Sequence, residues 1–285
     1  MRPFLGPPVP IPVQRLVYRA NTALARPLSG AVFDRTDLAG VSTEVVRPPE
    51  GWREGAVVLY LHGGGFVVGS ARGYRSLTSR LARSCGAEVY VPEYRLAPEN
   101  SFPAPVDDCF AAYRALLEQG IEPRRIVIAG DSAGGNLALA TTLEIGGMDL
   151  PLPAALVLVC PWLDLTMSAE SNRVNSGSDP VLRAGWFKQT VPAYCGGMRS
   201  QDPRISPLFA DLRNLPPTLL HVAGRDPLLD DGLRFVSRAE AARVDVTVER
   251  FDRLWHDFHC LAGLLDPADL AIDSIGEFVK KRVIV

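Results

Sequence analysis

The clearest structural signal in the sequence lies in residues 126–135, which read Ile126-Val127-Ile128-Ala129-Gly130-Asp131-Ser132-Ala133-Gly134-Gly135. The first residues form a short apolar, β-branched run, which predicts a buried strand. A G-x-S-x-G pattern follows, and the next segment, Asn136 to Glu144, is rich in Ala and Leu and predicts a helix. This order is the context of a nucleophile elbow, a sharp turn with a serine at its apex. Gly130 and Gly134 lack the side chains that would keep the strand and the helix apart.

Length and composition are those of an ordinary globular protein. The chain has 285 residues, which suffices for one large domain or for one domain with a small lid. Hydrophobic residues make up 47% and charged residues 22%, and 30 basic against 32 acidic residues leave a formal charge of −2. Because no run of like charge stands out, neither nucleic acid nor an anionic membrane is an implied partner.

The sequence also bears on cellular location. Prolines at positions 3, 7, 8, 10 and 12 argue against the apolar region of a secretory signal, and no stretch approaches the length of a membrane span. The five cysteines are scattered without a C-x-x-C pair, which predicts reduced, mostly buried thiols rather than disulfides or a zinc site. We therefore expect a cytoplasmic enzyme.

Apolar runs and amphipathic segments alternate along most of the chain. Besides the run at Ile126, strands are predicted at residues 57–61, 88–91, 155–159, 218–222 and 246–249, with an edge strand at 41–47. Helices are predicted at residues 11–24, 75–85, 107–118, 233–242 and 266–281. Such alternation predicts an α/β fold with a mainly parallel central sheet flanked by helices.

The alternation is interrupted between about Ser168 and Leu212. This part contains clusters of Asn, Gly, Ser and Pro around one helix-like segment at residues 181–194, which carries three large aromatic side chains, Trp186, Phe187 and Tyr194. An interruption with exposed aromatics predicts a cap inserted into the α/β fold. The alternative is that these aromatics belong to an ordinary core.

Three consecutive glycines follow the strand at residues 57–61, within His62-Gly63-Gly64-Gly65-Phe66. They could form a merely flexible loop. The alternative is a set of backbone N–H donors, because glycines let these groups face a developing oxyanion with no side chain in the way.

A nucleophilic serine needs a base to accept its proton and an acid to orient that base. Of the four histidines, His62 precedes the elbow and His221 lies within a strand pattern. His256 and His259 remain, and both follow the last strand. One of them is expected to be the base and the other a surface or supporting residue.

The acid is expected between the elbow and these histidines. Asp226 follows the strand at residues 218–222, at the carboxyl end where active-site groups of α/β sheets lie. Asp230 and Asp231 are better explained as first-turn residues of the next helix. Asp131, adjacent to the serine, is expected to have a structural hydrogen-bonding role.

With these residues in view, residues 40–283 resemble the hormone-sensitive-lipase-like esterases, bacterial family IV of the α/β-hydrolase fold. The motifs that carry the resemblance are His62-Gly63-Gly64-Gly65-Phe66, Tyr94-Arg95-Leu96-Ala97-Pro98-Glu99, Gly130-Asp131-Ser132-Ala133-Gly134-Gly135 and Asp226-Pro227-Leu228. The resemblance implies a carboxylesterase for short- to medium-chain esters, with Ser132 as nucleophile, His256 as base and Asp226 as acid. It implies an oxyanion hole formed by the N–H groups of Gly64, Gly65 and Ala133.

The resemblance also implies a helical cap, built from residues 1–45 and 168–205, over a core of residues 46–167 and 206–285. One departure stands out: the family usually has glycine after the catalytic histidine, where this chain has Asp257. His256 is nevertheless the favoured base, because Phe258 follows it as in the family's pattern.

Two other functions share the same sequence features. A serine amidase or peptidase would use the same triad, and a small-molecule receptor on this fold would have lost a triad member. No cofactor or metal is expected, because the chain has no H-E-x-x-H motif, cysteine cluster or P-loop. The oligomeric state is left open between a monomer and a homodimer.

Overall fold

Eight strands form one central sheet in the computed structural model, which describes residues 4–50 and 55–283. The strand order is β1-β2-β4-β3-β5-β6-β7-β8. The strands are β1 (Val32–Leu38), β2 (Val41–Arg47), β3 (Val57–Leu61), β4 (Glu88–Pro92), β5 (Ile126–Asp131), β6 (Ala155–Val159), β7 (Thr218–Ala223) and β8 (Val246–Phe251). β1 and β2 run antiparallel to their neighbours, and the other strands pair in parallel. The α/β fold predicted from the sequence is confirmed.

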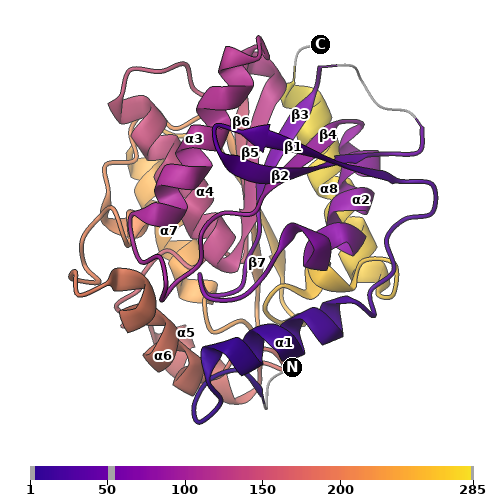
Figure 1. Ribbon diagram of the computed structural model, residues 1–285. Coiled ribbons are helices and arrows are strands. Elements are labelled where there is room, and N and C mark those ends of the chain that lie inside the picture. The colour runs from indigo at the N-terminus through magenta and orange to yellow at the C-terminus, as the bar shows by residue number, and fades with distance from the viewer. Residues whose placement is uncertain (1–3, 51–54, 284–285) are drawn as a thin grey trace.

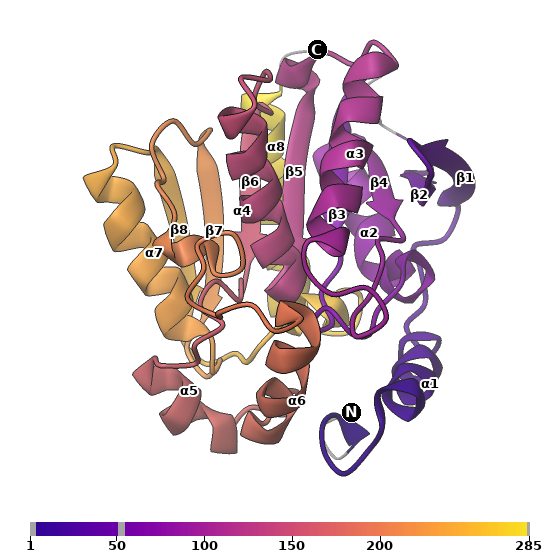
Figure 2. The ribbon, with the colours of Figure 1, turned by 60° about the vertical axis from the view of Figure 1, so that its left-hand side comes forward.

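The central strands are buried on both faces, as continuous apolar runs require. Every residue of β3, β5, β6 and β7 is buried. Helices cover both faces of the sheet (Figures 1 and 2), with α3, α4 and α7 on one side and α2 and α8 packed together on the other. These helices are α2 (Ala71–Cys85), α3 (Ala104–Glu118), α4 (Ser132–Gly147), α7 (Leu229–Ala241) and α8 (Asp266–Arg282).

Several boundaries differ from the sequence prediction. The segment 41–47 is not an edge strand, because β1 pairs with its outer side and takes the edge position. β1 was missed because its side chains are mostly exposed or half-buried, which leaves no apolar alternation to detect. α4 begins at Ser132 rather than Asn136, because the elbow itself forms the first turn of the helix.

Three helices lie together at one end of the sheet (Figures 1 and 2): α1 (Ile11–Thr22), α5 (Glu170–Val174) and α6 (Ala184–Cys195). Hydrogen bonds join the N-terminal segment, which contains α1, to the insertion, which contains α5 and α6. Gln14 of α1 accepts a bond from the Trp186 indole N–H at 3.0 Å and donates one to Gln189 at 2.7 Å. Arg183 binds the carbonyl oxygens of Leu5 and Pro7.

The aromatic residues of the insertion are buried, so the expectation that they are exposed was wrong. The Tyr194 ring stacks on Phe66 with a centroid distance of 3.7 Å, and Phe187 packs edge-on against Trp162 at 5.0 Å. Since both partners belong to the core, the insertion is held onto the α/β core by aromatic packing.

The predicted division into cap and core meets one difficulty at its first boundary. Strands β1 and β2 begin within residues 1–45 but are hydrogen-bonded into the sheet. A cap segment that ends before Val32 fits the structure better than one that ends at residue 45. The rest of the division stays a prediction, and its parts at residues 1–3, 51–54 and 284–285 lie outside the described residues.

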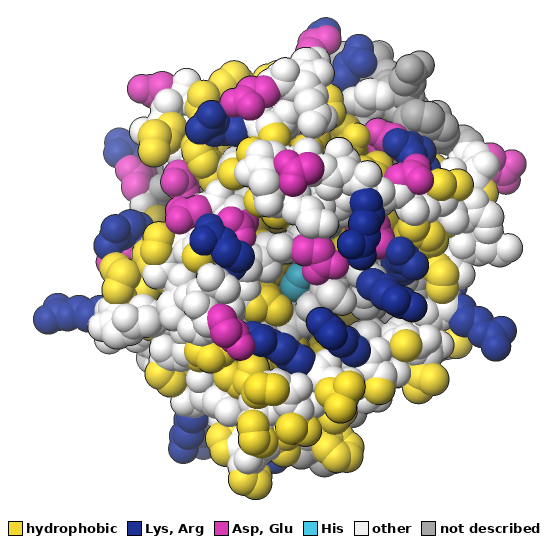
Figure 3. Space-filling view, in the orientation of Figure 1, with side chains coloured by type: hydrophobic (Ala, Val, Ile, Leu, Met, Phe, Trp, Pro, Cys, Tyr) yellow, Lys and Arg dark blue, Asp and Glu magenta, His cyan; other side chains and the backbone are white. Residues whose placement is uncertain are grey.

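The outer side of α1 is apolar and exposed. Leu16 is 68% exposed and Leu24, just beyond the helix, is 80% exposed. Hydrophobic side chains gather at the lower edge of the face in Figure 3, where α1 lies in Figure 1, while basic and acidic side chains intermix above them.

Within the described residues, no helix has the length and apolar character needed to cross a bilayer. All five cysteines are free, and four are buried.

The elbow glycines allow a direct test of the fold. A Cβ added at Gly134 would lie 1.9 Å from the carbonyl oxygen of Leu61, so Gly134→Ala forces β3 and α4 apart. We expect a loss of about 1–3 kcal/mol in unfolding free energy, measured by denaturant titration.

Gly147→Ala at the other end of α4 is the matched control, because nothing lies within 4 Å of the added Cβ. It should leave stability unchanged or raise it slightly, since alanine favours the helix. Equal effects of the two substitutions would contradict the steric explanation.

Candidate active site

Ser132 occupies the apex of the turn between β5 and α4. Its backbone has φ of +53°, in the left-handed region that non-glycine residues rarely adopt. The turn is closed so tightly that a Cβ at Gly130 would lie 2.3 Å from the carbonyl oxygen of Gly134. This is the tight turn that the G-x-S-x-G pattern predicts.

Ser132, His256 and Asp226 form one hydrogen-bonded chain. The Nε2 atom of His256 is 2.9 Å from Ser132 Oγ, and its Nδ1 atom is 2.9 Å from Oδ2 of Asp226. Asp226 follows β7 and His256 follows β8, and these neighbouring strands bring the two loops together. All three side chains are buried.

The charges around His256 favour its protonated form. Burial by itself lowers the pKa of His256, but the carboxylates of Asp226 and Asp257 outweigh burial and raise this pKa well above the ordinary value. An imidazole with this environment is stabilised as the imidazolium that a general base becomes.

Asp179, which the sequence analysis missed, fixes the loop that carries His256. Its Oδ2 accepts the backbone N–H of His256 at 2.9 Å, and its Oδ1 accepts the N–H groups of Val181 and Leu182, each at 2.7 Å. The insertion is thereby tied to the histidine loop. No local pattern could reveal this, because Asp179 and His256 are 77 residues apart in the chain.

Asp131 holds the glycine loop beside the serine. Its Oδ1 accepts hydrogen bonds from the Gly63 N–H at 2.9 Å and the Tyr60 hydroxyl at 2.7 Å, and its Oδ2 accepts one from the Tyr74 hydroxyl at 2.7 Å. Burial raises the pKa of Asp131, while these three bonds oppose the rise. Asp131 therefore connects the elbow to the end of β3. Tyr60 and Tyr74 were not singled out by the sequence analysis.

The three residues predicted to form the oxyanion hole lie in the glycine loop after β3 and in the first turn of α4. Gly64 and Ser132 line the same cavity, and Gly64 has φ of +122°, which favours glycine. Gly65 lies under the insertion, since a Cβ there would be 3.1 Å from the Trp186 ring. Ala133 is in the first turn of α4, where the helix dipole is positive.

His62 is a buried residue that supports the glycine loop. Burial lowers its pKa to about 4, so the ring is neutral at physiological pH. The ring stacks on Tyr94, and the Tyr94 hydroxyl donates to the His62 carbonyl oxygen at 2.6 Å. Tyr94 begins the Tyr94–Glu99 motif, which gives that motif a structural role beside the site.

His259 lies away from Ser132, in a buried pair with His221. Its Nε2 atom is 3.1 Å from Nδ1 of His221, and its ring packs on Phe258. Burial lowers the pKa of His259 well below the ordinary value, with His221 and His256 adding to this effect. The structure thus brings His256, and not His259, to the serine. Of the two alternatives for the second histidine, a surface or a supporting residue, the structure excludes the surface position, because both rings of the pair are buried.

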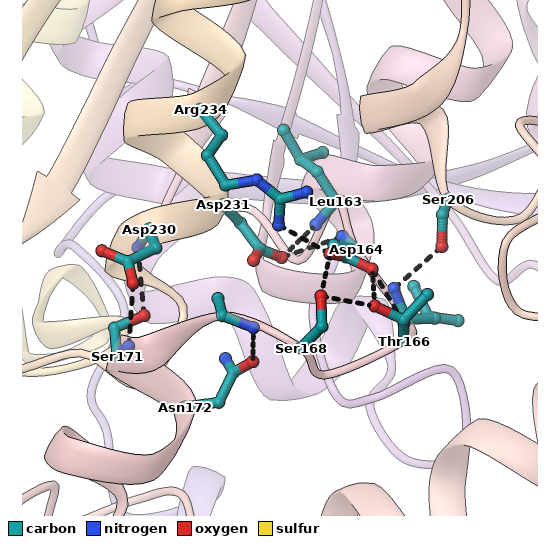
Figure 4. A network of polar contacts seen from close by, with 12 residues as sticks. Leu163, Asp164, Thr166, Ser168, Ser171, Asn172, Ser206, Asp230, Asp231 and Arg234 are labelled. Atoms are coloured by element: carbon teal, nitrogen blue, oxygen red, sulfur yellow. Dashed lines mark hydrogen bonds and ion pairs between the residues drawn. The ribbon is translucent and has the colours of Figure 1, made fainter.

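A polar network fastens the insertion next to Asp226 (Figure 4). Asp231 accepts the backbone N–H groups of Leu163 and Asp164, each at 2.9 Å, and Arg234 pairs with Asp164 at 2.6 Å. Asp230 accepts the N–H of Ser171 in α5 at 2.8 Å. Asp230 and Asp231 lie in the first turn of α7, and both are used for structure.

One group of side chains has the composition of a metal site. Ligand atoms of Cys160, Asp226 and His256 all lie within 4.8 Å of one another. Burial raises the pKa of the Cys160 thiol well above its ordinary value, so it stays protonated and is a poor ligand. Since Asp226 and His256 are also hydrogen-bonded to each other, we assign no metal to this group.

A serine at a strand-to-helix elbow defines an α/β hydrolase when it is hydrogen-bonded to a histidine that is in turn hydrogen-bonded to an aspartate, both after parallel strands. Residues 58–260 match the family described as alpha/beta hydrolase fold. The chain is also similar to a crystal structure of an esterase from the bacterial hormone-sensitive lipase family. The TM-score is 0.94 at 40% identity, covering 98% of this chain and 93% of the other.

Two related proteins indicate which kind of hydrolase the chain resembles. An esterase of Acinetobacter venetianus is 38% identical over 242 residues, or 85% of this chain and 79% of the relative. An acetyl-hydrolase of Streptomyces hygroscopicus is 37% identical over 239 residues, with 84% and 79% covered. The chain belongs to the bacterial hormone-sensitive-lipase (family IV) esterases of the α/β-hydrolase fold, and it is a carboxylic ester hydrolase.

The geometry predicts different outcomes for the two neighbouring histidines. His256→Ala removes the only histidine that contacts Ser132 among the described residues, and we expect kcat for an activated ester to fall at least about 10³-fold. His259→Ala should lower the melting temperature by opening a cavity beside Phe258 but retain substantial kcat per folded molecule. The reverse order of the two kcat values would move the base to His259.

Proposed function

We propose that the protein is a serine carboxylesterase that hydrolyses short- to medium-chain esters through an acyl-enzyme intermediate. The observation that carries the proposal is the continuous chain from Ser132 Oγ through His256 to Asp226, with two contacts of 2.9 Å. This geometry gives the serine a base within hydrogen-bond reach and gives the base an orienting carboxylate.

In the acylation step, Ser132 Oγ forms a bond to the ester carbonyl carbon while its proton passes to Nε2 of His256. The carbonyl π electrons move to the carbonyl oxygen. The tetrahedral intermediate then collapses, the bond to the alcohol oxygen breaks, and the imidazolium returns the proton to the leaving alkoxide. Water repeats the sequence on the acyl-enzyme and releases the carboxylic acid and free Ser132.

The negative charge on the carbonyl oxygen needs donors that are fixed in advance. We assign this role to the N–H groups of Gly64, Gly65 and Ala133. The carbonyl oxygen of Gly64 already accepts the N–H groups of Val67 and Val68, at 3.1 and 3.0 Å, which fixes the loop. The Asp131–Gly63 bond fixes the other side of the loop against the elbow.

The size of the cavity favours small substrates. A cavity of about 120 Å³ adjoins Ser132 and His256, and its apolar lining includes Leu5, Tyr18, Val181, Leu182, Trp186 and Trp255. Sites for drug-sized ligands usually measure roughly 300–1,000 Å³. The name of the Streptomyces relative, acetyl-hydrolase, also supports a small acyl group.

Two further expectations go with this proposal. The substrate is a small-molecule ester, handled without a metal or other cofactor. The cytoplasmic location and the homodimer raised by the sequence stay predictions. Gel filtration with light scattering and cell fractionation test them.

Ser132→Ala removes only the attacking oxygen and should abolish ester hydrolysis while leaving the fold intact. We expect kcat to fall at least about 10³-fold, measured on p-nitrophenyl butanoate with the melting temperature as the folding control. A fluorophosphonate probe should label the unmodified protein but not the variant. If folded Ser132→Ala keeps more than a few per cent of the rate, the nucleophile lies elsewhere.

A panel of p-nitrophenyl esters tests the cavity argument. We expect kcat/KM to be highest from acetate to butanoate and to fall as the chain outgrows the cavity. A second series with a constant acetyl group and longer alcohols separates the acyl side from the alcohol side. Matched amides test the amidase alternative, and a higher kcat/KM for amides than for esters would contradict the proposal.

A further inference from the structure

Asp257, the residue after the predicted base, has its carboxylate in contact with Nε2 of His256, the nitrogen that faces Ser132. Oδ2 of Asp257 is 2.9 Å from Nε2 of His256, the same atom that lies 2.9 Å from Ser132 Oγ. Asp257 also lines the cavity beside Ser132, and its side chain is 14% exposed. The orienting acid Asp226 contacts the opposite ring nitrogen, Nδ1, so the imidazole lies between two carboxylates.

The backbone explains why an aspartate can occupy this position. Asp257 has φ of +50° and ψ of +35°, the left-handed conformation. Glycine adopts this conformation without strain, and aspartate and asparagine tolerate it better than most other residues do. The position therefore accepts glycine, asparagine or aspartate, but only aspartate brings a charge to Nε2.

We propose that Asp257 is a fourth residue of the catalytic centre, which shares a proton with Nε2 of His256 and must release it before His256 can act as the base. When the pair holds this proton, Nε2 is engaged with Asp257 and cannot accept the proton of Ser132. When the pair loses it to solvent, a neutral imidazole with a free Nε2 lone pair faces Ser132 Oγ. The inference rests on the proposed serine esterase function.

Burial of both partners supports a shared proton. Burial raises the pKa of the Asp257 carboxyl to about 8, although His256 opposes the rise. Oδ1 of Asp257 is buried and has no hydrogen-bond partner among the described residues, so the charged form of this carboxyl is stabilised only through Oδ2, which faces His256. Since the carboxylates of Asp226 and Asp257 also raise the pKa of His256, the pair retains its proton to a higher pH than an isolated histidine would.

No other titratable group around the Asp257–His256 pair, among the described residues, brings a negative charge to Nε2 of His256. Burial raises the pKa values of five nearby tyrosines and cysteines, namely Tyr18, Tyr60, Tyr74, Cys160 and Cys260. Burial lowers the pKa of His259. All six groups are therefore uncharged at neutral pH. The remaining carboxylates are Asp131 and Asp179, which accept bonds from hydroxyl or backbone groups. Within the described part of the chain, Asp226 and Asp257 are the only carboxylates that contact the His256 ring nitrogens.

The test compares pH–rate profiles of kcat/KM for the unmodified protein, Asp257→Asn and Asp257→Gly. Both substitutions suit the left-handed backbone and remove the charge at Nε2. We expect the acid limb of the unmodified enzyme to lie above the ordinary histidine pKa of about 6.5. In both variants it should move to lower pH by about one unit or more, which makes them about tenfold faster than the parent on the acid side.

Asp252→Asn is the matched control, because it removes a carboxylate from the same β8–η5 connection (η5, Phe258–Leu261), where the Asp252 side chain is 71% exposed. Its profile should superimpose on that of the parent. Unchanged acid limbs in both Asp257 variants, or a parent limb at or below about 6.5, would overturn the proposal.

A second measurement does not depend on turnover. In the NMR spectrum of the imidazole groups, His256 should be the single histidine that stays protonated at pH 7, because burial lowers the pKa values of His62, His221 and His259. Its titration midpoint should fall in Asp257→Asn. If the protein hydrolyses no ester but this midpoint shifts, the proposed function fails and the Asp257–His256 pair stands. If hydrolysis depends on Ser132 but the midpoint does not move, only the role of Asp257 fails.

Discussion

The close approach of α4 to the carboxyl ends of β3 and β5 is the constraint on which the site depends. At Gly134 an added Cβ would meet the Leu61 carbonyl oxygen at 1.9 Å, and at Gly130 it would meet Gly134 itself. The absence of side chains lets the strand reverse into a helix within a few residues, and Ser132 accepts a left-handed φ as a consequence. The main chain therefore fixes the position of Ser132, and the contact of 2.9 Å with His256 Nε2 orients its hydroxyl.

Asp131 extends this constraint to the neighbouring strand. One carboxylate, buried beside the serine, ties the Gly63 N–H to the hydroxyls of Tyr60 and Tyr74, so the glycine loop and the elbow keep their relative positions. Electrostatic stabilisation of an oxyanion requires donors that do not reorganise during the reaction. An aspartate with three donors meets this requirement, at the cost of burying a carboxyl whose pKa is raised.

The histidine loop is held from two directions. Asp226 contacts the Nδ1 atom from the core, and Asp179 accepts the backbone N–H from the insertion. The insertion is in turn anchored by α5 on Asp230 and by aromatic packing on Phe66 and Trp162. Movement of the insertion would therefore alter both the shape of the cavity and the position of the base. The carboxylate of Asp257 adds an electrostatic influence on the same imidazole, independent of these anchors.

The sequence by itself determined the parallel sheet and the elbow, because both depend on local patterns: continuous apolar runs for β3, β5, β6 and β7, and two glycines around Ser132. It also placed Asp226 and His256 after strands whose ends meet in the sheet. Position in the chain left His256 and His259 open, and the family resemblance alone favoured His256. The tertiary structure separates them physically, since the loop conformation sends one ring to Ser132 and the other to His221. The contact of Asp179 with His256 likewise emerged only in the folded chain, because the two residues lie 77 positions apart. Asp257 is next to His256 in the sequence, but adjacency alone does not decide that its carboxylate contacts Nε2; the loop conformation does.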